Sequence, residues 1–317
     1  MNILSTVKLP TVLKQQIESK FPTVTFYHDK KIDEALDILA EADILFTYGE
    51  DLTASHIQAA TKLKWIMVGS AGIEKLPFDE IEKRGILVTN SKGVHAIPMA
   101  EYCLAMMLQV SRQAKALIEN EKAHKWDRTV RMMELYGKTV YILGAGAIGQ
   151  ETAKLTQAFS MKVLGMNQDG RPVEYFQEMY TYKELKETIK EADFVISVLP
   201  STEQTKGLLN YELFKEMKRE AVFINIGRGD VVNEKDLLKV LDEGLISHAV
   251  LDVFEHEPLD EHHPFWDMEN VTITPHLSGI TKNYLPRVMP IFEDNLERFR
   301  NGELSMMRNI IDLRKQY

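Results

Sequence analysis

The chain has 317 residues, a hydrophobic content of 44% and a formal net charge of −9, which together predict a folded protein with a substantial core. The acidic balance and the lack of a Lys/Arg block argue against a nucleic-acid or anionic-membrane surface. Cys103 is the only cysteine, which excludes an internal disulfide and a metal site built from several cysteines. Residues 1–10 lack the features of a signal peptide, and no apolar run approaches the ~20 residues of a membrane helix. We therefore expect a cytoplasmic protein with no metal, membrane or nucleic-acid partner.

The first ninety residues alternate short apolar runs with amphipathic stretches, a pattern typical of a parallel sheet covered by helices. The expected helices in this region cover residues 10–19 and 33–39. The expected strands cover residues 3–6, 24–27, 44–47, 65–68 and 86–89. This region is predicted to form one α/β unit.

A long helical pattern follows over residues 97–121. Apolar and small residues recur there at helical spacing, among them Ala100, Leu104, Met107 and Leu108. We expect one helix that links two lobes. Its methionine-rich stripe is typical of a core or subunit interface rather than of a cofactor site.

Residues 139–149, TVYILGAGAIG, predict a buried strand, a glycine turn and the start of a helix. Gly144 would permit the tight turn, Gly146 would let the backbone approach a pyrophosphate, and Gly149 would let the helix pack closely on the strand. The spacing alone also fits a plain structural turn. The strand before it and the helical pattern after it favour a dinucleotide-binding turn, in which the helix N-terminus receives the phosphates.

A second α/β unit begins with this strand. Further strands are expected over residues 162–166, 194–199, 221–226, 247–253 and 271–274, and the resulting six strands suit a dinucleotide fold. The segment 284–298 is helical again, and it would have to return to the first lobe to supply that lobe's missing cover. The N-terminal lobe is therefore predicted to be discontinuous.

The second strand of the nucleotide unit ends in GMNQDGRP, where an acidic residue usually holds the ribose 2′-hydroxyl of NAD. Asn167 occupies that place. A neutral residue there removes repulsion against a 2′-phosphate, and Arg171 would be able to pair with such a phosphate. Asp169 would equally serve NAD, and Arg171 also fits an ordinary solvated loop. The run leaves both cofactors open and slightly favours NADP.

Two further strand ends carry candidate chemistry. Arg228, in INIGRGD, lies where ligands bind in open α/β sheets and would be able to hold a carboxylate, although an exposed turn arginine is the alternative. His276, in TITPHLSG, is either a structural residue or an imidazole oriented by a carboxylate. Asp252, Glu255 and Glu257 lie on the exit of another strand and are the candidate partners.

The ordered motifs GAGAIG, LPSTEQTKGLLN, NIGRGD, LDVFEHEPL and TPHLSG resemble the D-isomer-specific 2-hydroxyacid dehydrogenase family. The N-terminal segments VGSAGIEKLP and SKGVHAIPMAEYCLAMML extend the resemblance over nearly the whole chain. It implies an α/β fold with two doubly wound parallel-sheet domains. A Rossmann nucleotide-binding domain, residues 96–283, would be inserted in a flavodoxin-like substrate domain, residues 1–95 plus 284–317, and relatives pair as homodimers through the nucleotide lobes.

The resemblance also implies a role for each matching residue. His276 would exchange a proton with the substrate's 2-oxo oxygen as hydride moves from the nicotinamide, Glu257 would be its acid partner, and Arg228 would grip the carboxylate. The substrate carboxylate would also contact the loop of Ser70, Ala71 and Gly72. The implied cofactor contacts are Gly144, Gly146, Ala147, Ile148, Gly149, Asn167, Arg171, Leu199, Pro200, Thr205, Ile226, Gly227, Asp252, Ser278 and Gly279.

Two positions depart from the family pattern: Asn167 replaces the common acid, and Glu74 replaces a frequent Asp in the first-lobe turn. We expect an NAD(P)-dependent enzyme that reduces a small 2-oxo acid, such as glyoxylate or hydroxypyruvate, to the D-2-hydroxy acid. Formate dehydrogenase-like chemistry is disfavoured because those relatives carry glutamine at the position of Glu257. The alternative function is a dinucleotide-sensing, corepressor-like binding protein, which turnover with a panel of 2-oxo acids would exclude.

Overall fold

The computed structural model describes residues 1–29, 31–73 and 75–313, and the chain divides into two compact units. Unit 1 combines Met1–Val94 with Thr281–Tyr317, and unit 2 is the continuous stretch His95–Ile280. The domain limits expected from the sequence lie within three residues of these bounds. The assignment of unit 1 to the substrate and of unit 2 to the dinucleotide stays a prediction.

The sheet of unit 1 is entirely parallel and has the strand order β2-β1-β3-β4-β5, which is the flavodoxin-like order. Its strands are β1 (Asn2–Ser5), β2 (Thr25–His28), β3 (Ile44–Thr47), β4 (Trp65–Val68) and β5 (Leu87–Asn90). Its helices are α1 (Thr11–Lys20), α2 (Leu36–Glu41), α3 (Ala54–Ala59), α4 (Phe78–Lys83) and α11 (Tyr284–Asn301), with 3-10 turns η1 (Ile32–Glu34) and η5 (Leu304–Met306). The strands match the predicted ones to within one residue.

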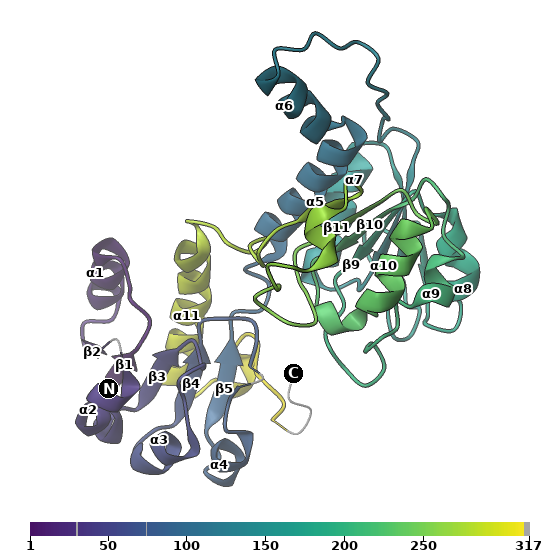
Figure 1. Ribbon diagram of the computed structural model, residues 1–317. Coiled ribbons are helices and arrows are strands. Elements are labelled where there is room, and N and C mark those ends of the chain that lie inside the picture. Colours follow the sequence, from purple (N-terminus) through teal and green to yellow (C-terminus); the bar gives the residue numbers. More distant parts are fainter. Residues whose placement is uncertain (30, 74, 314–317) are drawn as a thin grey trace. The chain divides into compact units, whose positions relative to one another are not determined.

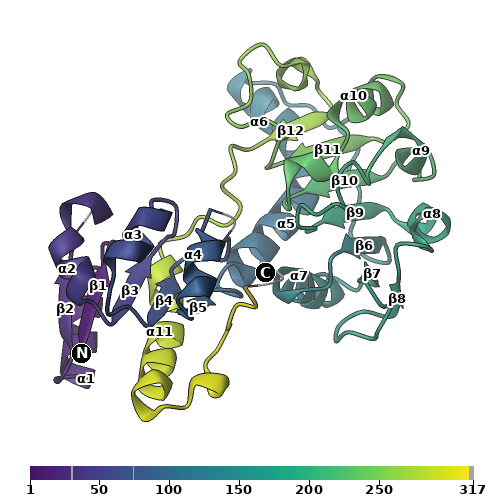
Figure 2. The same ribbon diagram turned by 90° about the horizontal axis from the view of Figure 1, so that it is seen from below.

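Helices cover both faces of this sheet (Figures 1 and 2). α2, α3 and α4 pack on one face, and α1 and α11 pack on the other. Phe292 of α11 stacks on Phe46 and Trp65, with ring centroids 5.0 Å and 5.6 Å apart. The late helix therefore completes the core of the N-terminal unit, as the apolar pattern of residues 284–298 predicted.

The sheet of unit 2 is also parallel, with the order β12-β11-β10-β9-β6-β7-β8. Its strands are β6 (Thr139–Leu143), β7 (Lys162–Met166), β8 (Glu178–Tyr180), β9 (Phe194–Ser197), β10 (Val222–Asn225), β11 (His248–Leu251) and β12 (Val271–Ile273). Its helices are α5 (Ala96–Ser111), α6 (Ala114–Lys122), α7 (Ala147–Ala158), α8 (Leu185–Thr188), α9 (Tyr211–Phe214) and α10 (Glu234–Asp242), with 3-10 turns η2 (Ile189–Glu191), η3 (Gly229–Val231) and η4 (Pro264–Asp267). The order reverses between β6 and β9, which is the switch point of a Rossmann sheet.

Successive residues of the central strands enter two different cores, because side chains alternate across a strand. In β6, Val140 and Ile142 pack with α5 and α7, whereas Tyr141 and Leu143 pack with the helices of the opposite face. Figures 1 and 2 show α5 and α7 on one side of this sheet and α8 to α10 on the other. Burial on both faces explains why the strands read as continuous apolar runs.

Three sequence-based expectations were wrong. The single helix over 97–121 is interrupted, since α5 ends at Ser111 and Gln113 adopts a left-handed φ of 54° before α6. The helix over 33–39 is a 3-10 turn followed by a short α-helix. Unit 2 has seven strands instead of six, because the short and partly polar β8 gave no apolar run. Among the described helices, none has the length and apolarity needed to cross a bilayer.

Candidate active site

The glycine turn after β6 has the geometry that the three glycines predicted. Gly144 has a φ of +105°, which favours glycine. A Cβ on Gly149 would lie only 2.1 Å from the carbonyl oxygen of Gly144, so the helix packs directly on the turn. Gly146 caps α7, and no atom lies within 4 Å of where its Cβ would be. The N-terminus of α7, which begins with Ala147 and Ile148, therefore faces open space, and an incoming phosphate fits there.

The loop after β7 is held by its own polar groups. Asn167 donates its side-chain amide to the carbonyl of Arg171 at 2.9 Å and accepts from the backbone N–H of Gly170 at 2.6 Å. Asp169 accepts from the N–H of Arg171 at 3.3 Å, and its carboxylate lies 3.9 Å from the exposed guanidinium. Both functional atoms of Asn167 thus shape the loop.

The loop after β9 is similarly ordered from within. Thr205 is 1% exposed and donates its hydroxyl to the carbonyl of Pro200 at 2.6 Å. Leu199 is buried, and its backbone contacts the turn after β10, where a Cβ on Gly227 would lie 2.5 Å from the oxygen of Leu199. Pro200 is exposed. The structure therefore gives Thr205 a part in building this loop, and contact with a cofactor stays a prediction.

Arg228 lies between Gly227 and Gly229, and each glycine packs closely against the backbone of a neighbouring loop. Gly227 packs on Leu199, and a Cβ on Gly229 would lie 1.9 Å from the backbone carbon of Phe254. The exposed guanidinium of Arg228 donates to the carbonyl of Gly227 at 2.9 Å. The close contacts on both sides fix the turn after β10, which also contains the buried Ile226, and so fix where Arg228 leaves the sheet.

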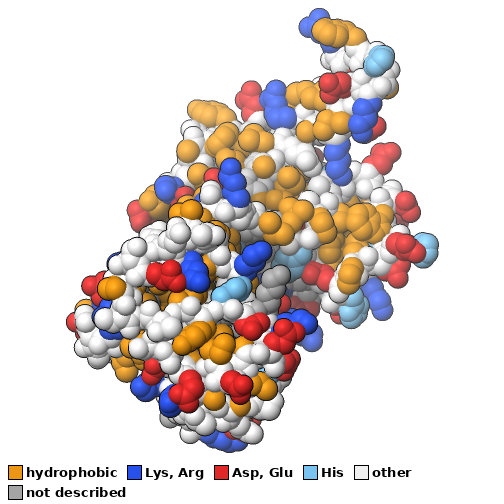
Figure 3. Space-filling view, turned by 90° about the vertical axis from the view of Figure 1, so that its left-hand side faces the viewer, with side chains coloured by type: hydrophobic (Ala, Val, Ile, Leu, Met, Phe, Trp, Pro, Cys, Tyr) orange, Lys and Arg blue, Asp and Glu red, His pale blue; other side chains and the backbone are white. Residues whose placement is uncertain are grey.

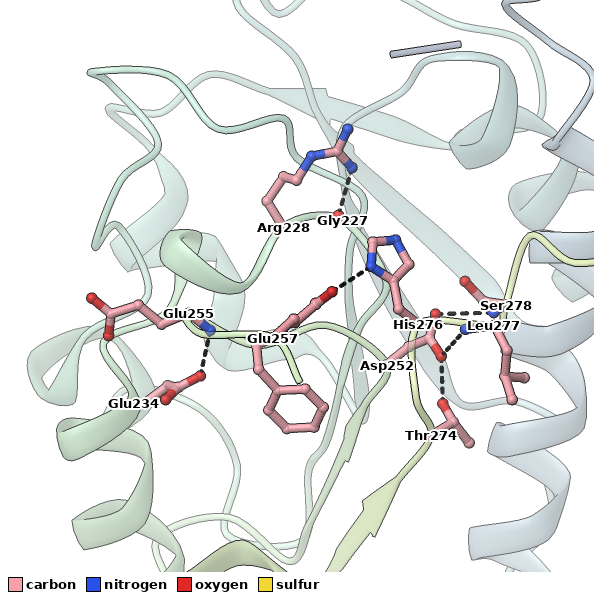
Figure 4. A network of polar contacts seen from close by, with 11 residues as sticks. Gly227, Arg228, Glu234, Asp252, Glu255, Glu257, Thr274, His276, Leu277 and Ser278 are labelled. Atoms are coloured by element: carbon pink, nitrogen blue, oxygen red, sulfur yellow. Dashed lines mark hydrogen bonds and ion pairs between the residues drawn. The ribbon is translucent and has the colours of Figure 1, made fainter. Parts of the chain in front are cut away.

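His276 and Glu257 form the hydrogen-bonded pair at the centre of the site (Figure 4). Nδ1 of the imidazole lies 2.8 Å from Oε2 of Glu257, and the two side chains are 53% and 35% exposed. The other carboxylate oxygen accepts from the N–H of Phe254 at 3.0 Å, which orients the carboxylate. Glu255 points elsewhere, with its N–H bound to Glu234. Of the candidate acids after β11, Glu257 is the partner of His276.

Asp252 holds the loop that carries His276. Its carboxylate is 0% exposed and accepts from the hydroxyl of Thr274 at 2.5 Å and from the N–H groups of Leu277 and Ser278 at 2.9 and 3.0 Å. The backbone N–H of His276 donates to the carbonyl of Asp252 at 2.8 Å. Donors from both sides of the histidine therefore converge on one aspartate (Figure 4). The contact of Asp252 with the cofactor, at the nicotinamide amide, which the family resemblance implies, stays a prediction.

Reasoning from the sequence missed two residues near the pair, Tyr102 and His95. Tyr102 of α5 lies 2.6 Å from Thr274, oxygen to oxygen, and its burial raises its pKa, so this hydroxyl stays protonated. His95 packs against Gly279, where a Cβ would lie 2.9 Å from the ring. Burial, followed by the positive charge of Arg228, lowers the pKa of His95 and keeps it neutral. Both residues lie in the segment SKGVHAIPMAEYCLAMML that carries the family resemblance, but nothing in that segment assigned either of them a role.

The predicted carboxylate loop of Ser70, Ala71 and Gly72 belongs to unit 1 and follows β4. The hydroxyl of Ser70 donates to the carbonyl of Gly72 at 2.9 Å, and Asn90 donates its side-chain amide to the carbonyl of Ala71 at 2.7 Å. These bonds order the turn at the carboxyl edge of its own sheet. Glu74, the departure noted in this loop, lies outside the described residues.

Within unit 2, the arrangement supports proton transfer beside a dinucleotide. The glycine turn, the Arg228 turn and the His276 loop all leave the carboxyl edge of one sheet, where ligands of such folds bind. In Figure 4 the side chains of Arg228 and His276 extend into the same part of this edge. A carboxylate-bound imidazole is a general acid and base, and a guanidinium binds a carboxylate with two hydrogen bonds.

Residues 104–278 match the family described as "D-isomer specific 2-hydroxyacid dehydrogenase, NAD binding domain". A glyoxylate reductase from Pyrococcus furiosus is 30% identical over 94% of this chain and 93% of its own length. A D-isomer specific 2-hydroxyacid dehydrogenase family protein from Aeromonas salmonicida is 32% identical, covers 98% of this chain and 99% of its own, and superposes with a TM-score of 0.88. An NADPH-dependent glyoxylate/hydroxypyruvate reductase from Sinorhizobium meliloti, in complex with NADP and sulfate, is 27% identical with a TM-score of 0.81, over 100% of this chain and 99% of its own.

Proposed function

The chain belongs to the D-isomer-specific 2-hydroxyacid dehydrogenase family, and on that premise we propose that it reduces glyoxylate, hydroxypyruvate or a similarly small 2-oxo acid to the D-2-hydroxy acid. The enzyme class, an NAD(P)-dependent dehydrogenase, follows from the family. The glyoxylate reductase and the glyoxylate/hydroxypyruvate reductase among its relatives support the substrate class. The proposed site combines Arg228, Glu257 and His276.

The proton comes from His276. Because Glu257 engages Nδ1 of the ring, Nε2 is the nitrogen that holds a proton for the 2-oxo oxygen. The negative charge of Glu257 stabilises the imidazolium, and its hydrogen bond from the N–H of Phe254 keeps the pair aligned. A bound nicotinamide would supply the hydride. In the reverse direction, Nε2 takes the proton from the 2-hydroxyl group.

Arg228 binds the substrate carboxylate and places the 2-oxo group near His276. Its fork of N–H donors matches a carboxylate, and its positive charge favours the negative charge that develops on the 2-oxo oxygen. The close packing of Gly227 and Gly229 limits movement of this turn, so little reorganisation is needed when the substrate binds.

The Glu257–His276 pair at 2.8 Å is the observation that carries this proposal. It provides an acid and a base in the same unit as the dinucleotide turn. The test is turnover of a panel of 2-oxo acids with NADH and NADPH, with chiral analysis of the product. We expect reduction of glyoxylate or hydroxypyruvate, and a D product wherever the carbon becomes chiral. Binding of both dinucleotides without turnover of any panel member would contradict the proposal.

We also propose that NADPH is the preferred cofactor. Asn167 brings no negative charge to the loop that reads the adenosine ribose, so a 2′-phosphate meets no repulsion from it. The NADPH-dependent relative from Sinorhizobium meliloti supports the same preference. Comparison of kcat/KM for the two cofactors tests it, and equal or higher values with NADH would contradict it.

A homodimer is the proposed assembly. α6 and the irregular stretch 123–137 extend beyond the sheet of unit 2 and lie at the top of Figures 1 and 3, where apolar side chains stand among charged ones. The large exposed apolar side chains of α6 and the stretch 123–137 are Leu117, Ile118, Trp126, Met132 and Tyr136. An apolar surface of this kind is usually covered by a partner. Sedimentation at micromolar concentration should give a dimer, and a monomer would contradict this assignment.

A further inference from the structure

A cavity of unit 2 lies at the carboxyl ends of β7 and β8, beside the loop after β9. Its volume is about 650 Å³, and it is lined by Gln168, Thr181, Tyr182, Lys183, Gln204 and Leu208. In a sheet of this order, the end of the strand next to the glycine turn is where the adenosine ribose is read. The cavity therefore lies where the adenosine half of a dinucleotide would reach.

Lys183 is the only charged side chain among the lining residues, and the others are neutral. It is exposed, and among the residues that the structure describes no carboxylate forms an ion pair with it. The adjacent Glu184 points to Thr181 instead, because one of its oxygens accepts from both the N–H and the hydroxyl of Thr181 at 2.9 Å. Lys183 is therefore the one cation that lines this cavity and is available to a phosphate.

The Asn167 loop packs against the same segment. The N–H of Asn167 donates to the carbonyl of Tyr180 at 3.1 Å, and a Cβ on Gly170 would lie 3.2 Å from the methyl group of Thr181. The side chain of Asn167 is bonded into its own loop at both ends, so it shapes the cavity wall. The next residue, Gln168, is the one that lines the cavity.

Arg171, the cation expected from the sequence to pair with a 2′-phosphate, is less well placed than Lys183 to bind one in this cavity. It does not line the cavity. Its guanidinium is 77% exposed and lies 3.9 Å from the carboxylate of Asp169, which offsets part of its charge. A phosphate in the cavity would meet Lys183, whose ammonium is ion-paired with no carboxylate of the described residues.

We infer that Lys183, assisted by the side-chain amide of Gln168, binds the 2′-phosphate of NADPH and sets the preference for NADPH over NADH. This inference rests on the proposed function, because it assigns a residue to the cofactor of that reaction. The ammonium group supplies the charge, and the Gln168 amide adds a donor that a 2′-phosphate accepts. Arg171 then contributes little.

Isothermal titration of NADPH, NADH, 2′-AMP, 5′-AMP and inorganic phosphate tests the inference without relying on turnover. Lys183→Gln should weaken NADPH and 2′-AMP binding by about 10- to 100-fold and leave NADH and 5′-AMP within about twofold. Lys186→Gln, three residues away and exposed, is the matched control and should change none of these affinities by more than about twofold. Tight binding of inorganic phosphate, lost equally in Lys183→Gln, would show a general anion site and would overturn the assignment to the adenosine phosphate.

The same titration of Arg171→Gln decides between the two cations. A loss of NADPH affinity confined to Arg171→Gln, or an equal loss of NADH and NADPH in Lys183→Gln, would overturn the inference. Turnover separates it from the proposed function. A wild type that reduces glyoxylate while Lys183→Gln keeps its NADPH affinity contradicts the inference alone. A wild type with Lys183-dependent NADPH binding and no 2-oxo acid reduction contradicts the proposed function alone.

Discussion

Asp252 shows how one buried side chain positions another that does the chemistry. Its two oxygens accept from Thr274, Leu277 and Ser278, and these residues flank His276. The backbone of His276 has a left-handed φ of 50°. Residues other than glycine rarely adopt this conformation, and contacts with the surrounding structure must stabilise it. The buried carboxylate provides those contacts. The sequence identified Asp252 as a candidate but did not reveal these partners, because they come from a strand end that lies far along the chain.

Replacing Asp252 by asparagine should therefore impair both folding and catalysis. The new NH₂ group would face N–H and O–H donors in place of an acceptor, at a cost of about 1–3 kcal/mol in unfolding free energy. We expect kcat to fall by at least about tenfold, since His276 loses its fixed position. Urea unfolding and initial rates measure the two effects. Asp267→Asn, at an exposed site, serves as the control, and a change confined to the cofactor KM would instead support direct contact with the nicotinamide.

His248 gives the unit a stability that depends on pH. Burial, together with the positive charge of Lys115, lowers the pKa of His248 to about 4, and its Nε2 lies 2.9 Å from the hydroxyl of Thr272. Between about pH 6.5 and pH 4, His248 is protonated in the unfolded chain but stays neutral in the folded chain. Stability should fall on the order of 3 kcal/mol between pH 6.5 and pH 4 from this residue.

In the variant His248→Gln, the unfolding free energy should fall less steeply as the pH is lowered from 6.5 to 4. The measurement is the unfolding free energy in urea at several pH values between 7 and 4. His262→Gln, whose side chain is 87% exposed, should keep the wild-type slope. Identical slopes for wild type and His248→Gln would mean that this histidine does not carry the effect.

At the scale of elements, the turn after β10 depends on Gly229. The contact of 1.9 Å between its Cβ position and Phe254 involves backbone, which cannot move aside as a flexible side chain can. Gly229→Ala should therefore cost about 1–3 kcal/mol in unfolding free energy and displace Arg228. We expect kcat/KM for the 2-oxo acid to fall by at least about tenfold, with the affinity for NADPH changed less. Unchanged kinetics would show that Arg228 does not depend on this contact.

Apolar periodicity was sufficient to predict most elements, because strands buried on both faces and helices with one apolar face have distinct patterns. It failed where the backbone changes direction without a glycine or proline. Gln113 separates α5 from α6 in a left-handed conformation that no neighbouring residue type predicts. It also failed at β8, which joins the edge of the sheet with a short and partly polar run.

The candidate site was predictable only in part. Arg228, Glu257 and His276 were identified by motif, and the close pairing of Glu257 with His276, rather than Glu255, is a feature of the structure. Packing contacts between separate loops, such as His95 against Gly279, have no local sequence signal. Lys183 also had no local sequence signal, because its position beside Gln168 depends on how β8 pairs with β7.

At the scale of the whole molecule, each unit has its own cores, so the two are expected to respond differently to mutation and ligand. Phe292 is fully buried in unit 1, and Phe292→Ala should cost about 3–5 kcal/mol there. In calorimetry, this variant should lower the transition of unit 1, whereas added NADPH should raise that of unit 2. A single transition that the mutation and the dinucleotide shift alike would contradict independent cores.

In the proposed reaction, the Glu257–His276 pair transfers the proton to the 2-oxo acid. The most direct test is the rate of NADPH oxidation by glyoxylate or hydroxypyruvate in wild type and His276→Ala, with NADPH affinity measured on the same samples. We predict that wild type turns over and that His276→Ala loses about 10²- to 10⁴-fold in kcat while it binds NADPH within about twofold of wild type. Equal turnover by both proteins, or NADPH binding by wild type with no reduction of either acid, would contradict the claim.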